Sequence, residues 1–213
     1  MKLNKKVIFF ITFMVMGFFA FGHPHVFFTS TEEFVFDDDK VQGCWIQWTF
    51  DSYFSADMDF YYDWDDNNFY DQAEIEELFN FAFINLENYH YFTFIRQGEK
   101  RSSPVEVCNF HAWQEDGILT YRFYIDLSYL EGNDFHFAVY DYTFFCDIRY
   151  PENSITFSGN DNLNVTYDIA QNKDYPVFYD PWGAADDNTI YTKWRPGLET
   201  YYPLEIHVQY EKK

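Results

Sequence analysis

The chain has 213 residues and a formal net charge of −21 at neutral pH, from 14 basic and 35 acidic side chains. So negative a surface repels phosphate, which excludes nucleic acid as a partner and disfavours anionic membranes, while cations are concentrated near it. Aromatic residues make up 24% of the sequence, with 27 Phe and 19 Tyr, and such side chains favour half-buried strands, so we expect a mainly β fold.

The first 22 residues have the pattern of a secretory signal peptide. Three lysines precede an apolar run at 7–19, and the small residues Ala20 and Gly22 stand where a signal peptidase cuts. The run is too short to predict a membrane span. We therefore expect cleavage near Gly22, a single β-rich domain at 23–213, and a periplasmic or secreted protein without stable membrane insertion.

Cleavage at this point would give the mature protein an N-terminal His23, with His25 two residues further on. An amine and two imidazoles suit zinc, nickel and copper. Pro24 has no amide hydrogen, which excludes the square-planar copper or nickel site that uses consecutive backbone amides. Either the amine and the His23 imidazole bind the ion, or both imidazoles bind it with a distant group. The candidates for that group are Asp141 and, after it, Asp51, His136 and His111.

Residues 25–50 predict a β-hairpin. Two alternating runs, 25–36 and 41–50, are separated by the polar turn 37–40. A short helix is allowed after residue 52, because Phe54 and Met58 are four residues apart.

Residues 63–74 fit the calcium-binding loop of an EF-hand. Asn68 occupies the sixth position, where glycine is usual, and asparagine tolerates the left-handed backbone needed there. The alternative is an acidic loop that starts a helix without an ion. We expect a structural calcium site whose ligand positions are Asp63, Asp65, Asn67, the Phe69 carbonyl, Asp71 and Glu74.

The remaining elements follow from periodicity. Apolar residues at helical spacing between 75 and 86 predict a helix, so that 52–88 forms a helical insertion in an antiparallel, β-sandwich-like fold. The alternating pattern then returns, while 171–203 reads mostly as loop. The expected strands are 89–95, 105–113, 119–127, parts of 135–150, 154–157, 163–168 and 204–210.

Cys44, Cys108 and Cys146 form an odd set, which permits at most one internal disulfide in an oxidising compartment. They lack the close spacing of a zinc ribbon, and we do not expect them to bind metal.

Four motifs, in this order, resemble the family known as domain of unknown function 1007. They are 23–27, 48–55, the loop 63–74 with its helix, and 139–145, in a resemblance that covers about residues 23–150. Such proteins are periplasmic and are typically encoded beside nickel/cobalt-type permeases, which implies transition-metal handling outside the cytoplasm. Two departures matter: Asn68 replaces the loop glycine, and Tyr142 replaces the proline of the family's Tyr-Asp-Pro segment, which changes how Asp141 is presented.

The leading hypothesis is a secreted accessory protein that captures or delivers zinc, nickel or cobalt for a membrane permease through His23, His25 and Asp141. One alternative is a calcium-stabilised extracytoplasmic binding or structural β-protein. Another is a copper enzyme that uses an N-terminal histidine, as secreted copper monooxygenases do. Because we find no Ser/His/Asp arrangement, phosphate loop or HExxH motif, we do not expect an enzyme.

Overall fold

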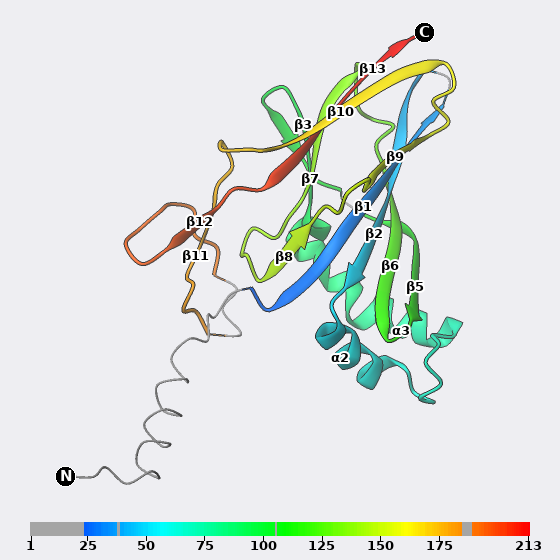
Figure 1. Ribbon diagram of the computed structural model, residues 1–213, viewed down its shortest axis with the longest axis vertical. Coiled ribbons are helices and arrows are strands. Elements are labelled where there is room, and N and C mark those ends of the chain that lie inside the picture. The colour runs from blue at the N-terminus through cyan, green and yellow to red at the C-terminus, as the bar shows by residue number, and fades with distance from the viewer. Residues whose placement is uncertain (1–23, 38, 105, 185–188) are drawn as a thin grey trace, which may run out of the picture.

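Two β-sheets and a helical layer make up the fold, as the computed structural model shows (Figure 1). The structure describes residues 24–37, 39–104, 106–184 and 189–213. Sheet A has the strand order β5-β6-β2-β1-β8, with β9 also paired to β1; sheet B has the order β10-β13-β7-β3-β4; β11 and β12 form a small third sheet. This confirms the predicted mainly β, sandwich-like fold.

The elements of the described chain have the following bounds: β1 (Val26–Asp37), β2 (Lys40–Phe50), α2 (Ser52–Tyr62), α3 (Gln72–Phe81), the 3-10 helix η1 (Phe83–Phe92), β3 (Thr93–Gln97), β4 (Lys100–Ser102), β5 (Cys108–Glu115), β6 (Ile118–Asp126), β7 (Asp134–Val139), β8 (Cys146–Arg149), β9 (Ile155–Ser158), β10 (Leu163–Gln171), β11 (Val177–Tyr179), β12 (Glu199–Tyr201) and β13 (Leu204–Lys212).

The hairpin of β1 and β2 is the longest strand pair and supplies much of the inner face of sheet A. Its register pairs Phe28 with Phe50 and Phe34 with Cys44. Alternation turns one face of β1 inward, since Phe28, Phe34 and Phe36 are buried. One feature differs from the expectation of antiparallel pairing: β8 and β9 pair with β1 in parallel, because the chain reaches this edge through long crossovers rather than tight turns.

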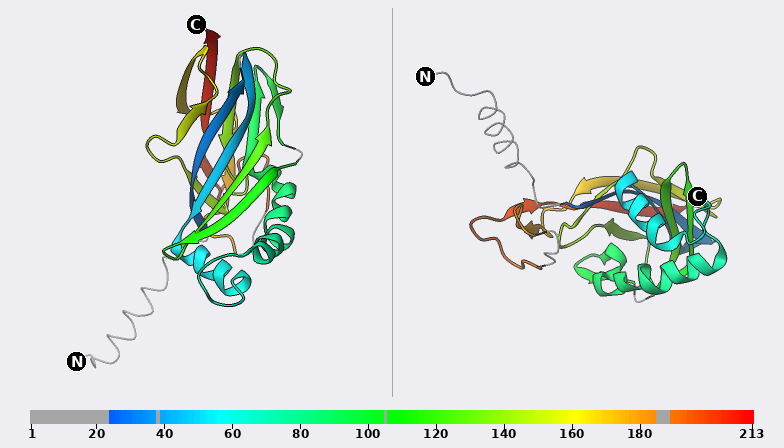
Figure 2. Two further views of the ribbon diagram at one scale, coloured as in Figure 1. Left: turned by 90° about the vertical axis from the view of Figure 1, so that its right-hand side faces the viewer. Right: turned by 90° about the horizontal axis from the view of Figure 1, so that it is seen from below.

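Two different layers cover the inner face of sheet A. At one end it packs on sheet B, where the Phe34 ring lies 5.5 Å from Phe135 and 5.3 Å from Phe137 between centroids. At the other end it packs on α2, α3 and η1, which we call the helical layer (Figure 2). There the rings of Trp48 and Phe83 lie with their centroids 6.1 Å apart. The hydrophobic core is continuous across both ends.

A carboxyl group is buried at the sheet-on-sheet end. Glu32 is 1% exposed on β1, and its Oε1 accepts a hydrogen bond of 2.5 Å from the Ser30 hydroxyl. Burial raises the pKa of Glu32 to about 8, although the bond from Ser30 acts in the opposite direction. The side chain is therefore mostly protonated at neutral pH, which removes the cost of burying a charge.

The helical insertion and the C-terminal third differ in detail from the predictions. Residues 89–92 belong to η1 rather than to a strand, since His90 and Tyr91 have positive φ angles that end the strand pattern. The segment 171–203 contains β11 and β12 as well as loop. All three cysteine thiols are free. Among the described residues, no helix has the length and apolar character needed to cross a membrane.

Candidate functional site

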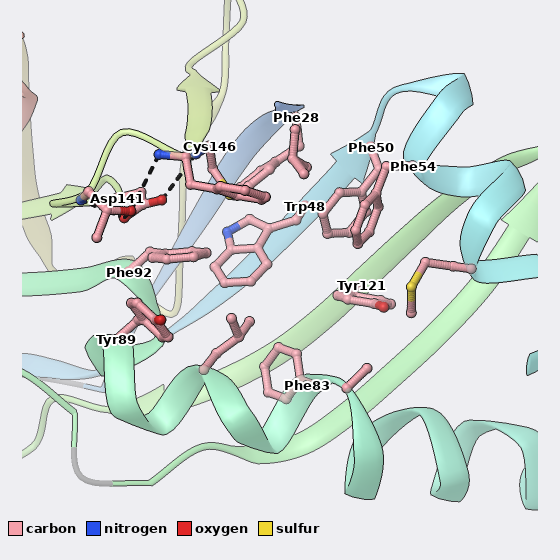
Figure 3. A pocket seen from close by; sticks show the side chains of 16 residues that line it. Phe28, Trp48, Phe50, Phe54, Phe83, Tyr89, Phe92, Tyr121, Asp141 and Cys146 are labelled. Carbon is pink, nitrogen blue, oxygen red and sulfur yellow. Dashed lines mark hydrogen bonds between the residues drawn. The ribbon is translucent and has the colours of Figure 1, made fainter. Parts of the chain in front are cut away.

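An apolar cavity of about 470 Å³ lies between sheet A and the helical layer. Its walls come from β1, β2 and β6 on one side and from α2, η1 and the end of α3 on the other (Figure 3). Asp141 and Cys146 lie at one end, and Phe54 and Tyr121 at the other. The lining is mostly aromatic and aliphatic, which suits an apolar small ligand.

The predicted metal ligand Asp141 lies at this cavity, 2% exposed. Its Oδ1 accepts hydrogen bonds from the backbone N–H of Thr143 at 2.8 Å and from the Thr143 hydroxyl at 2.7 Å. Its Oδ2 accepts a bond of 3.0 Å from the Cys146 backbone N–H. Burial raises the pKa of Asp141, although these bonds act in the opposite direction. The carboxylate therefore holds the turn between β7 and β8 in shape.

The N-terminal segment runs beside the same turn. The His25 backbone N–H donates to the Phe145 carbonyl at 2.8 Å, and the two rings are 5.1 Å apart. His23 lies outside the described residues, so a site made of His23, His25 and Asp141 stays a prediction. The structure brings the backbone of His25 and the Asp141 turn together through the parallel pairing of Val26 with Cys146.

The expected helices on either side of the acidic loop are present as α2 and α3, and α3 begins within the predicted loop, at Gln72, so that residues 63–71 join the two helices. Asn68 has the expected positive φ of 61°. Three carboxylates meet here: Asp63, Asp65 and Glu74 each place one oxygen within 4.8 Å of the other two. Calcium coordination itself stays a prediction, and so do the roles of Asn67, Phe69 and Asp71.

The carboxylates of this loop are largely engaged by its own backbone. Both Glu74 oxygens accept backbone hydrogen bonds, from Trp64 N–H at 2.7 Å and Asp71 N–H at 2.8 Å. Asp71 caps α3 by accepting from Ala73 and Glu74, and with Glu74 forms a capping box. Asp63 accepts from the backbone N–H groups of residues 67 and 68. This arrangement supports the reading of an acidic helix-initiating loop.

A second group of metal-ligating side chains lies on the outer face of sheet B, and we call it the histidine–carboxylate group: Asp134, His136 and His207. One ligand atom from each lies within 4.8 Å of the others. His136 and His207 are direct partners on β7 and β13, and their rings stack with centroids 4.1 Å apart and planes 6° apart. His207 Nε2 lies 3.0 Å from Asp134 Oδ1.

Neighbouring residues set the electrostatics of this group. Partial burial acts to raise the pKa of Asp134, but hydrogen bonds from Gln209 and His207 outweigh it and keep that pKa below its usual value. Burial lowers the pKa of His136, and the Arg96 guanidinium acts in the same direction. Arg96 is itself paired with Glu205, at 2.7 Å from Nη2 to Oε2. Asp134 is therefore ionised and His136 favours its neutral form, which are the states that a metal ion binds.

Sequence reasoning treated His136 only as a minor candidate and missed Asp134 and His207. Each histidine stands between two buried apolar residues of its strand. Because side chains alternate between the two faces of a strand, the histidine lies on the outer face of sheet B, opposite the core. That pattern was visible in the sequence, but the pairing of β7 with β13 across about seventy residues was not. Of the other candidates, Asp51 caps α2, and His111 is exposed on β5.

Comparisons with known proteins agree with the motif resemblance. A family model described as "Protein of unknown function (DUF1007)" matches residues 8–210. The chain is also 36% identical over 84 residues to an uncharacterised 15.5 kDa protein of Spirochaeta aurantia, a match that spans 38% of this chain and 60% of that relative. No solved structure is significantly similar. Since the family model covers nearly the whole sequence, this chain belongs to the DUF1007 family.

Proposed function

We propose that this chain is an extracytoplasmic accessory protein that captures a transition metal ion, either zinc, nickel or cobalt, and delivers it to a membrane permease. The observation that carries the proposal is the convergence of Asp134, His136 and His207 to within 4.8 Å. Two imidazoles and one carboxylate suit these ions, whereas calcium and magnesium prefer oxygen ligands alone.

Metal binding at this group requires one local adjustment. The two rings are nearly parallel, so their in-plane lone pairs run side by side and one ring must tilt for both to reach a single ion. Around a tetrahedral ion with bonds of about 2.0–2.2 Å, ligand atoms lie about 3.3–3.6 Å apart. The side chain of His207 is 26% exposed, so such a tilt does not disturb the core.

Asp168 supports the orientation of His207. Its Oδ1 lies 3.5 Å from His207 Nδ1, on the opposite side of the ring from Asp134. Metal-binding histidines commonly donate their second ring N–H to a carboxylate, which fixes the tautomer and makes the ligating nitrogen more basic. Without metal, His207 Nε2 shares its proton with Asp134; when an ion displaces that proton, Asp168 is placed to accept from the Nδ1–H of the tautomer that metal binding requires.

Exchange of the ion suits a delivery role. Three protein ligands leave coordination positions for water or for a ligand of the next carrier, and the group lies on the outer face of sheet B with the Asp134 side chain 50% exposed. The net charge of −21 raises the local concentration of cations. The predicted signal peptide and the permease association of the resembling family support a location outside the cytoplasm.

Titration calorimetry of the mature protein with zinc and with nickel tests the proposal. We expect one ion per chain in the wild type and at least about a hundredfold weaker binding in the double variant His136→Ala/His207→Ala, or about 2.7 kcal/mol. The matched control is His90→Ala/His111→Ala, because these two histidines are exposed and lie outside the group. Unchanged affinity in the first double variant would contradict the proposal.

The second candidate function, a calcium-stabilised extracytoplasmic protein, is favoured by the convergence of Asp63, Asp65 and Glu74. An all-oxygen group of this kind suits a hard cation. Its role would be structural, because the loop joins α2 to α3 and contributes the cap of α3. The two functions are compatible, since they use different ligands in different parts of the molecule.

A further inference from the structure

The apolar cavity between sheet A and the helical layer is not used by the proposed metal function. Its volume of about 470 Å³ is within the range of about 300–1,000 Å³ found for small-molecule sites. An engineered apolar cavity of about 150 Å³ already stays dry and binds benzene. A cavity of this size is therefore large enough for a molecule of the size of a substituted naphthalene or a medium-length alkyl chain.

The walls select for an apolar body. Trp48 is fully buried, Phe28 is 4% exposed and Phe83 is 1% exposed, and all three face the cavity (Figure 3). Phe50 and Tyr121 extend the same surface at the far end. Each ring offers an apolar face or edge to a ligand, and burial of these surfaces favours binding in proportion to the area removed from water.

Two hydrogen-bonding atoms of the lining lack a partner. Trp48 Nε1 and the Tyr121 hydroxyl are both buried, and within the described chain neither makes a hydrogen bond. In Figure 3 the indole nitrogen is on the edge of the ring that faces the Asp141 end of the cavity. A buried polar atom without a partner is costly, and a ligand oxygen that accepts from the Trp48 indole after a small shift removes that cost.

The charges at the cavity disfavour an anionic ligand. Asp141 is at one end, and both of its oxygens are already occupied by Thr143 and Cys146. Among the residues that the structure describes, no Lys, Arg or His side chain lines the cavity, so a carboxylate or sulfonate head group finds no counter-charge there next to the Asp141 carboxyl. The net charge of −21 adds to this repulsion.

We propose that this cavity binds a small neutral molecule that has an apolar body and one carbonyl or hydroxyl oxygen. The apolar body lies against Trp48, Phe28 and Phe83, and the oxygen accepts a hydrogen bond from Trp48 Nε1. The cavity comes nearest to solvent at its half-buried lining residues, which are Val26, Phe54, Ala82, Leu86, Tyr89 and Phe145.

Fluorescence titration with prodan, a neutral naphthalene ketone, tests this proposal on the full mature protein in the presence of a chelator. We expect a blue-shifted emission that saturates at one molecule per chain and is displaced by decanol. The anionic naphthalene 1-anilinonaphthalene-8-sulfonate and decanoate should bind at least about tenfold more weakly, because their head groups meet Asp141 without a counter-charge. Absence of saturable prodan binding, or equal binding of the anionic probe, would overturn the proposal.

Substitutions locate the probe within the molecule. Leu86→Trp fills the cavity from the helical side and should weaken prodan binding at least about tenfold, whereas Phe81→Trp adds the same side chain at a position that is 69% exposed and should change nothing. If Leu86→Trp does not fold, as shown by its circular dichroism, Ala82→Phe takes its place. Trp48→Phe keeps an aromatic wall but removes the donor, and should weaken binding about three- to tenfold. Equal binding by all cavity variants would contradict the assignment.

Discussion

The acidic loop and the histidine–carboxylate group both gather metal-ligating side chains, but they do so in opposite ways. Asp63 and Glu74 belong to one loop of the chain, whereas Asp134 and His207 come together only where β7 pairs with β13. In the loop, both Glu74 oxygens accept hydrogen bonds from backbone N–H groups. On the sheet, the backbone groups pair with each other along the strands.

This difference has a physical cause. The first turn of a helix exposes N–H groups that have no partner within the helix, so acidic side chains placed there bind them. A strand in the middle of a sheet has few such unpaired groups, because its backbone bonds to a neighbour on each side. This is the case for β7, which lies between β13 and β3. Side chains on the outer face of that sheet therefore bond to one another and not to the backbone, as Asp134 does with His207 and Gln209, and a ligand competes only with those side-chain contacts. Local acidic clusters should be read first as helix caps, and non-local clusters first as sites.

The largest expected effect separates capping from metal binding. Glu74→Ala removes two hydrogen bonds between a buried carboxylate and the backbone, and should lower the free energy of unfolding by about 2–3 kcal/mol even with a chelator present. Thermal unfolding measures the change. Glu76→Ala, at an exposed position of the same helix, should stay within about 0.5 kcal/mol. A normal melting temperature of Glu74→Ala without calcium would show that the residue is mainly a ligand.

Asp168→Asn tests whether the carboxylate beside His207 positions a metal ligand. It should weaken zinc binding about tenfold, or about 1.4 kcal/mol, while the melting temperature without metal stays the same. The comparison variant is Glu211→Gln, which changes an exposed acid on β13 outside the group. Equal losses in the two variants would mean that Asp168 acts only through the general charge of the surface.

Asp65→Asn tests the calcium prediction without disturbing the cap. Asp65 is exposed, belongs to the group of three carboxylates, and is not one of the residues that cap α3. In the wild type, about 10 mM calcium should stabilise the folded state by about 1 kcal/mol if the dissociation constant is about 1–2 mM. Asp65→Asn should abolish that increment, and Asp66→Asn should keep it. Identical melting curves of the wild type with and without calcium would reject the ion.

The smallest effect concerns the N-terminal histidines. If the histidine–carboxylate group binds the ion, His23→Ala/His25→Ala should change zinc affinity by less than about threefold, or about 0.6 kcal/mol. Competition with a zinc-sensitive dye is precise enough for this range. A loss of tenfold or more would place the ion at the N-terminus, as the sequence analysis predicted. Sequencing of the mature terminus is the control, because a start beyond His25 removes both ligands.

Several features of this protein were determined by the sequence alone, because they depend on neighbouring residues. The hairpin of β1 and β2 follows from alternation on either side of a polar turn. The helix predicted over 75–86 is present in part, because α3 spans Gln72–Phe81 and the 3-10 helix η1 takes over at Phe83. Asn68 occupies the left-handed backbone position predicted for it. In each case the interactions span a few residues, so their pattern is present in the one-dimensional order.

Only the tertiary structure decided which of these patterns form sites. The register of β13 on β7 stacks His207 on His136, and no local pattern encodes which two strands will pair. The cavity beside Trp48 exists because the helical layer, rather than sheet B, covers that end of sheet A. The alternation of β2 fixes only that Trp48 points inward. Whether a second layer fills the space in front of it depends on packing between segments that are distant in the chain.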